Sequence, residues 1–273
     1  MTRYQPKQFD DRHIAVVDVE AVSGEQPEDG SFPPWPTFTP ILVSVLQADQ
    51  NSYGEWRFNL ETVRFFEDER PFETLDELLR GRGCVSFNGA GYDFPVLMLN
   101  AQKARCFQLP ALTAAATQPK WGNVHYDLAQ RCSNYGAARG GSLAILCDAL
   151  GIPVKTDMHG SDVAEAYDRG EIDRIEAYCS SDVAATLMVY AHQRAMEIGD
   201  PLYHASLTAQ FVRWAQVDGR KCLQPFTRVR QLDELLRLSL QGQIGAAEDV
   251  ARLNSEVRDK RALDASFGEA VRY

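Results

Sequence analysis

Apolar residues occupy almost every position from 14 to 19, and charged or polar residues flank this run. Such a run, rich in β-branched residues, is typical of a strand whose two faces are both buried in a sheet. Residues 41–48 have the same character, whereas residues 55–60 alternate between apolar and polar positions. We therefore predict three successive strands over residues 13–20, 41–48 and 55–60, arranged as a meander.

Further along the chain the apolar spacing becomes helical, interrupted by two short strands at residues 84–87 and 125–128. Helices are predicted over residues 72–79, 143–150 and 172–196, and after the glycine-rich turn near residue 90. Thr74, Ser142 and Ser161 are the predicted helix caps. This order predicts an α/β fold, in which helices flank a central sheet.

The pattern weakens after Gly199. Residues 202–217 and 232–240 still show helical spacing, but the last thirty or so residues are charged and poor in aromatic side chains. We expect one domain over residues 1–198, followed by a helical C-terminal extension over residues 199–273 with a flexible end.

Composition narrows the class of protein without naming its function. The 273 residues are 45% hydrophobic and 24% charged, which is typical of a globular chain. No stretch approaches the roughly 20 apolar residues of a membrane helix, and the polar N-terminus lacks the apolar centre of a signal peptide. We therefore expect a cytoplasmic protein with no membrane partner.

Charge and cysteine spacing exclude further classes. The formal net charge of -10 argues against a protein that coats nucleic acid through a broad basic surface. It does not exclude a nuclease, because carboxylates loaded with metal ions are locally electropositive. The six cysteines include no Cys-x-x-Cys pair and the five histidines lack ligand spacing, so neither a zinc site nor a disulfide framework is expected.

Asp18 and Glu20 close the first predicted strand. Residues two apart on a strand point to the same face, so both carboxylates would project together beside buried surroundings. Two such charges repel each other unless a cation lies between them, and Mg²⁺ or Mn²⁺ prefers carboxylate oxygen. The alternative is that Asp18 only ends the strand and Glu20 is solvated.

Three more polar residues occupy positions that suit the same site. Asp93 lies where the strand at residues 84–87 passes into a helix, either as a helix cap or as a third carboxylate. Tyr178 and Asp182 are four residues apart and therefore share one face of the long helix. An acid on a face that otherwise looks buried is unfavourable unless a partner compensates it.

Together these segments resemble the DnaQ-like 3′-5′ exonucleases of the RNase H-like superfamily, in the DEDDy subtype with four acids and a tyrosine. The resemblance covers about residues 10–198 and rests on Val17-Asp-Val-Glu20, Phe87-Asn-Gly-Ala-Gly-Tyr-Asp-Phe-Pro95 and Tyr178-Cys-Ser-Ser-Asp182. The middle motif is most similar to the exonuclease domains of family B DNA polymerases. His125-Tyr-Asp127-Leu and Gly160-Ser161-x-Val163 look like secondary motifs of stand-alone relatives.

The resemblance implies a mixed central sheet flanked by helices and two divalent cations, Mg²⁺ or Mn²⁺, held by Asp18, Glu20, Asp93 and Asp182. Tyr178 would orient the attacking water. The implied reaction is hydrolysis of phosphodiester bonds at the 3′ end of single-stranded nucleic acid, DNA in preference to RNA, releasing nucleoside 5′-monophosphates. The partner would be a single-stranded 3′ end, with a polymerase or repair protein in trans.

Other site residues remain open at this point. Asn88 either contacts the terminal nucleotide or buttresses its own turn, and Tyr92 either packs on the terminal base or lies in the core. Lys155 is a candidate phosphate contact, and Asp127 is either a group supporting the site or an ordinary strand end. The competing function is a non-catalytic nucleic-acid-binding module that retains the exonuclease fold.

Overall fold

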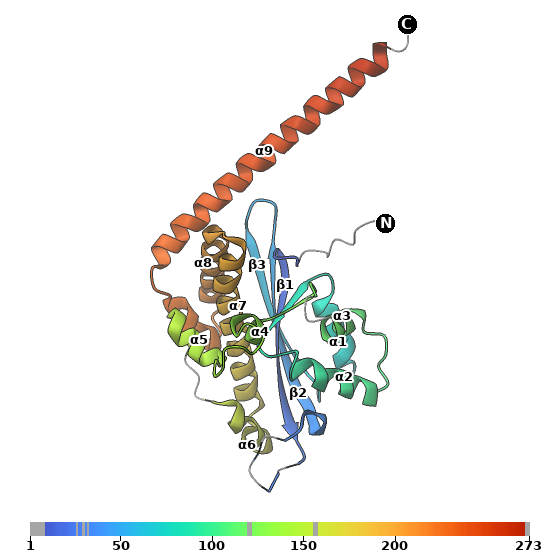
Figure 1. Cartoon of the computed structure of the whole chain (residues 1–273), viewed down its shortest axis with the longest axis vertical. Coiled ribbons are helices and arrows are strands. Elements are labelled where there is room, and N and C mark those ends of the chain that lie inside the picture. The colour runs from blue at the N-terminus through green and yellow to red at the C-terminus, as the bar shows by residue number, and fades with distance from the viewer. Residues whose placement is uncertain are drawn as a thin grey trace.

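A five-stranded mixed sheet forms the centre of the molecule in the computed structural model, which describes residues 9–25, 27–28, 31, 33–118, 122–154 and 158–270, with side chains as far as residue 258. The strand order is β3-β2-β1-β4-β5 (Figure 1). Strands β1 (His13–Ser23), β2 (Phe38–Gln50) and β3 (Trp56–Arg64) are antiparallel neighbours, which confirms the predicted meander. Strands β4 (Gly83–Ser86) and β5 (His125–Asp127) extend the sheet in parallel with β1.

Strand β1 is buried on both faces, as its apolar run predicts. Its odd-numbered residues, such as Ala15 and Val17, pack in one apolar cluster, and its even-numbered residues Ile14 and Val16 pack in another. Asp18 and Glu20 continue the even-numbered row. The two carboxylates therefore project from the face that the second cluster covers.

Helices cover both faces of the sheet (Figure 1). The first face carries α1 (Pro71–Leu79), α2 (Asp93–Lys103) and α3 (Pro110–Thr117). The second carries α7 (Ile172–Ile198) and α8 (Pro201–Asp218), with α4 (Leu128–Cys132), α5 (Leu143–Leu150) and α6 (Val163–Asp168) beside α7. Short 3-10 turns add η1 (Trp35–Thr37), η2 (Gly160–Asp162) and η3 (Lys221–Arg228).

One of the three predicted caps is confirmed. Ser142 caps α5, because its hydroxyl accepts a hydrogen bond from the Ile145 N–H at 3.3 Å. Thr74 is not a cap, since α1 already begins at Pro71, whose fixed φ suits the first helical position. Ser161 is not a cap either: it lies within η2, where the Asp162 carboxylate accepts from the His159 N–H at 2.9 Å.

The chain after residue 198 packs against the sheet before it leaves the body. Residues of α8 and η3, among them Leu207, Phe211 and Phe226, share one apolar cluster with Leu46 and Trp56 of the sheet. Helix α9 (Leu232–Ala270) then starts beside α8 and projects beyond the body (Figure 1). It is much longer than the predicted helix over residues 232–240.

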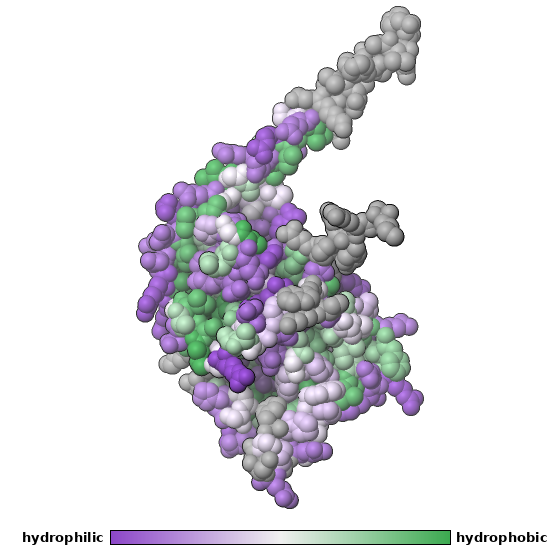
Figure 2. Space-filling view, in the orientation of Figure 1, coloured by the Kyte–Doolittle hydropathy of each residue, from purple (hydrophilic) through white to green (hydrophobic). Residues whose placement is uncertain are grey.

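The added length of α9 follows from residues 241–270, which are rich in the helix formers Ala, Leu, Glu and Arg. Apolar and polar residues mix on its visible surface (Figure 2). Its exposed apolar side chains include Leu240, Ile244, Leu253 and Val257. Within the described ranges, none of the helices combines the length and apolar character that crossing a lipid bilayer requires.

Candidate active site

Strand β1 supplies two carboxylates to one place. Asp18 lies opposite Ser44 of β2 and Glu20 lies opposite Leu42, and the register of the strand pair shifts immediately after Glu20. Glu20 is only 8% exposed. Strand β1 continues to Ser23, so Asp18 does not end the strand, and the irregularity falls immediately after the acids, as β-bulges often do beside functional sites.

Helix α7 brings three side chains to the same face. The Cys179 thiol donates hydrogen bonds to Asp18 Oδ2 and to the Asp18 carbonyl oxygen, both at 3.3 Å. One oxygen of Asp18, one oxygen of Glu20 and the Cys179 sulfur all lie within 4.8 Å of one another. Asp182, one helical turn beyond Tyr178, is hydrogen-bonded by the hydroxyl of that tyrosine.

Asp93 joins the site from the turn between β4 and α2. It is the first residue of α2 and only 4% exposed, and the helix begins without any side-chain capping hydrogen bond. The cap interpretation of Asp93 is therefore wrong. Its carboxylate instead lies near Asp18, whose charge raises the pKa of Asp93.

The four carboxylates repel one another. Burial raises the pKa of Asp18 to about 6 and that of Asp182 to about 8, and the Asp18 charge adds to the second shift. Burial also raises the pKa of Glu20, as do the charges of Asp18, Asp182 and Asp93. The charges of all four acids therefore act on one another across this site.

This donor set fits hard divalent cations. Oxygen atoms of Asp18 and Glu20 lie within 4.8 Å of each other, and the charges of Asp93 and Asp182 also act on Glu20, a repulsion that bound positive charge relieves. Cys179 does not suit the ligand role, because burial and the neighbouring carboxylates raise the pKa of its thiol and keep it protonated. We regard it as a hydrogen-bond donor that orients Asp18.

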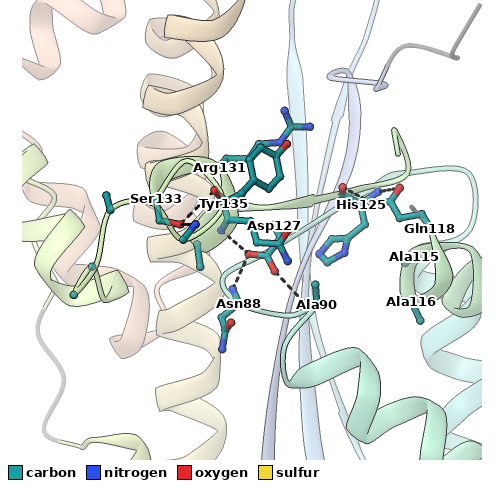
Figure 3. A pocket seen from close by; sticks show the side chains of 16 residues that line it. Asn88, Ala90, Ala115, Ala116, Gln118, His125, Asp127, Arg131, Ser133 and Tyr135 are labelled. Atoms are coloured by element: carbon teal, nitrogen blue, oxygen red, sulfur yellow. Dashed lines mark hydrogen bonds between the residues drawn. The ribbon is translucent and has the colours of Figure 1, made fainter. Parts of the chain in front are cut away.

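Asp127 clamps the turn that carries Asp93 (Figure 3). The N–H groups of Asn88 and Ala90 donate to its two carboxylate oxygens, each at 3.0 Å, and the Gln130 N–H donates at 3.3 Å. Asp127 is 6% exposed, so these bonds lie in a largely dry environment. It is therefore both the cap of α4 and a support of the site, and not only a strand end.

A second clamp holds the same turn from the other side. The Gly89 N–H donates to Ser86 Oγ at 3.1 Å, and that hydroxyl is hydrogen-bonded to His125 Nε2 at 2.7 Å. A side chain at position 89 would meet Ser86 Oγ and an oxygen of Asp93, so only glycine fits there. Asn88 has a left-handed φ of 65°, which asparagine tolerates better than most residues.

The remaining predicted residues have separate outcomes. Tyr92 is partly buried and its ring packs edge-on against Phe38, with centroids 5.2 Å apart. Burial and the charges of Asp93, Glu20 and Asp18 raise its pKa, so it also borders the site. The neighbouring Phe94 lies in the core at 1% exposure. Lys155 lies outside the described residues.

Sequence reasoning missed two contacts at this site. Cys179 lies within the third motif, but its partner Asp18 is 161 residues away in the sequence. Gly160 of the secondary motif lies next to the Tyr178 hydroxyl, which is 3.9 Å from where a Cβ at position 160 would be. The adjacency of cysteine to Tyr178 in the motif was the only available signal.

Comparison with a known structure finds a family B DNA polymerase. The chain is similar to the polymerase from the hyperthermophilic archaeon Pyrobaculum calidifontis, with a TM-score of 0.47 and 17% sequence identity. The alignment covers 77% of this chain and 27% of the polymerase, so this chain corresponds to a minor part of that protein.

A family model also matches the chain, over residues 31–216, and its description reads "Predicted 3'-5' exonuclease related to the exonuclease domain of PolB". The match includes the turn with Asp93 and the face with Tyr178 and Asp182, and it begins after the carboxylates of β1. It extends over more than half of the chain, and the chain therefore belongs to this family of exonucleases related to the exonuclease domain of PolB.

Proposed function

We propose that this protein is a metal-dependent 3′-5′ exonuclease of the DEDDy subtype. It would hydrolyse phosphodiester bonds at the 3′ end of single-stranded nucleic acid, DNA in preference to RNA, and release nucleoside 5′-monophosphates. The observation that carries the proposal is the convergence of Asp18, Glu20, Asp93 and Asp182, each with a raised pKa. Perturbed acids gathered in this way are typical of functional sites.

The four acids would hold two divalent cations, Mg²⁺ or Mn²⁺. When bound, such ions activate the attacking water and neutralise charge on the phosphate and on the leaving oxygen. Asp18 is the central ligand in this proposal, because its charge acts on Glu20, Asp93 and Asp182 alike. The Cys179 thiol fixes its orientation.

Tyr178 is the residue that we assign to orienting the attacking water. Its hydroxyl lies beside Asp182, and burial together with the carboxylates raises the pKa of the phenol. The group therefore keeps its proton at neutral pH and acts as a hydrogen-bond donor, not as a base. A polymerase or repair protein would be the partner for which this chain removes 3′ nucleotides in trans.

The proposal is tested with a 5′-labelled single-stranded DNA, its RNA counterpart, and the same DNA with a blocked 3′ end. We expect a ladder of products that shorten from the 3′ end, require Mg²⁺ or Mn²⁺, and disappear with chelator. The Asp18→Ala protein is the inactive control. Binding of either strand without any shortening would overturn the catalytic proposal and favour the non-catalytic binding module.

Replacing Tyr178 by phenylalanine should lower kcat by about 10²-fold and leave KM nearly constant, since a donor aimed at the reacting water acts mainly in the transition state. The measurement is steady-state hydrolysis of a single-stranded oligonucleotide. Tyr167→Phe is the matched control, because Tyr167, which lies on α6, packs against the same apolar cluster as Tyr178. Equal activity of Tyr178→Phe and wild type would remove Tyr178 from the mechanism and with it the DEDDy assignment.

A further inference from the structure

A cavity of about 720 Å³ adjoins the turn that carries Asp93 (Figure 3). Its walls come from residues 88–90, the end of α3, the β5–α4 junction and the loop from Ser133 to Gly141. None of the four acids lines it, although the turn that positions Asp93 does. The cavity is therefore a neighbour of the catalytic centre and not the centre itself.

The cavity is joined to the site through Asp127. Asp127 lines it and accepts the two hydrogen bonds from the turn at residues 88–90, and its charge raises the pKa of Asp93. A molecule in the cavity would therefore be in contact with the turn at one end. That end carries negative charge, as expected close to bound cations.

Arg131 also lines the cavity. Its guanidinium carbon lies 4.8 Å from the centre of the Tyr126 ring and 6.0 Å from that of Tyr135. Figure 3 shows the guanidinium directed away from Asp127. Its charge helps to lower the pKa of Glu197, but among the described side chains no carboxylate lies within ion-pair or hydrogen-bond distance of it.

Arg131 is held in this position before any ligand binds. The Tyr126 hydroxyl donates to Glu197 Oε1 at 2.6 Å, which fixes the ring beneath the guanidinium. An arginine stacked on aromatic rings loses little conformational freedom when it then contacts an anion. The N–H groups of the Arg131 guanidinium can donate hydrogen bonds to the oxygen atoms of a phosphate.

The covalent structure of a 3′ end determines which phosphate of the substrate Arg131 could contact. The terminal nucleotide has one phosphate, on its 5′ side, and that scissile phosphate must lie at the acids. Its other end is a free 3′-hydroxyl. An arginine in a neighbouring cavity therefore meets a phosphate only on the upstream side of the scissile bond.

We propose that this cavity binds the strand immediately 5′ of the scissile bond and that Arg131 contacts one of its backbone phosphates. The inference rests on the proposed exonuclease function. One wall consists of Gly136, Ala138, Gly140 and Gly141, which allow a sugar-phosphate backbone to approach closely. Contacts of this kind position a strand without reading its sequence, so every base should be accepted.

Two substrates separate this inference from the proposed function. An oligonucleotide has upstream phosphates, whereas thymidine 5′-(p-nitrophenyl phosphate) has the terminal nucleotide and scissile phosphate but nothing upstream. For Arg131→Gln we expect kcat/KM to fall on the oligonucleotide by about tenfold more than on the ester, mainly through KM. Arg131→Lys should recover part of that loss. Arg139→Gln is the matched control, because Arg139 is exposed in the same loop and lies outside the cavity walls.

A scan of the substrate tests the same contact in the wild-type protein. Replacing single upstream phosphates by uncharged methylphosphonates should raise the KM of the wild type at one or two positions. The KM of Arg131→Gln should not change when the same positions are replaced. If no upstream position matters to the wild type, or if Arg131→Gln loses activity equally on both substrates, the inference is wrong. A wild type that hydrolyses neither substrate would instead refute the exonuclease proposal.

Discussion

Replacing Asp18 by asparagine should lower kcat by at least about 10³-fold, because a ligand at the centre of the acid cluster contributes several kcal/mol to transition-state stabilisation. Asp18 is the one acid whose charge raises the pKa of all three others. Asparagine keeps the shape of the side chain and a carbonyl oxygen that can accept from Cys179. Only the charge is lost, which makes the change specific to cation binding.

The same substitution should stabilise the metal-free protein. At neutral pH Asp18 is ionised, since its pKa is about 6, and burial of this charge is unfavourable. Removing the buried charge is expected to raise the melting temperature by about 3 °C. Loss of activity with a gain of stability is the expected result where a site stores repulsion for its ligands.

Asp49 supplies the matched control on the neighbouring strand. It accepts from Arg82 at 2.8 Å and from His13 at 3.0 Å, and these partners lower its pKa. Asp49→Asn should therefore lose stability and retain activity, the opposite of Asp18→Asn on both measurements. Thermal melts in chelator and steady-state assays in Mg²⁺ give the comparison. If Asp18→Asn lowers the melting temperature as Asp49→Asn does, the acids are not a repulsive cluster.

Local patterns located most of the elements. The apolar run of β1, the serine cap of α5 and the long helix α7 were all predicted from spacing. The four acids and Tyr178 could be proposed together because each occupies one face of a strand, a turn or one helix face. These are properties of short segments, and short segments are what a sequence pattern reports.

The supports of the site could not be predicted in the same way. Asp127 and Asn88 are 39 residues apart, and Cys179 and Asp18 are 161 apart, so neither contact has a local signal. Arg131 was overlooked because nothing in its neighbours along the chain marks an arginine that stacks on Tyr126. The cap predicted at Thr74 failed because Pro71 starts the helix earlier, which is a competition between two local signals.

The stability of the metal-free protein should fall as the pH rises from about 6.5 to 8. Asp182, with a pKa of about 8, holds a proton in the folded state that the unfolded chain has already lost, and the pKa values of Glu20 and Asp93 are raised in the same direction. Groups whose folded pKa is raised stabilise below the unfolded pKa and lose that contribution as the pH rises through the folded pKa. About one extra proton over this range corresponds to about 2 kcal/mol.

This pH window separates the acids from other titrating groups. His125, His192 and His204 have lowered pKa values, so below pH 6.5 they make stability rise with pH and oppose the acids. Above pH 8 the cysteines of the unfolded chain begin to ionise, whereas buried Cys84 and Cys179 keep raised pKa values. Between these limits the acid cluster dominates the slope.

Denaturant unfolding at pH 6.5 and pH 8, with chelator and with millimolar Mg²⁺ or Mn²⁺, measures the effect. In chelator we expect the free energy of unfolding to fall between pH 6.5 and pH 8. The cations should reverse this fall, because they bind deprotonated carboxylates more strongly as the protons leave. Asp182→Asn should flatten the slope in chelator and raise stability at pH 8, since it removes the group that titrates in this range. A metal-free protein whose stability is constant or rises between these two pH values would contradict a cluster of mutually repelling acids built to hold divalent cations.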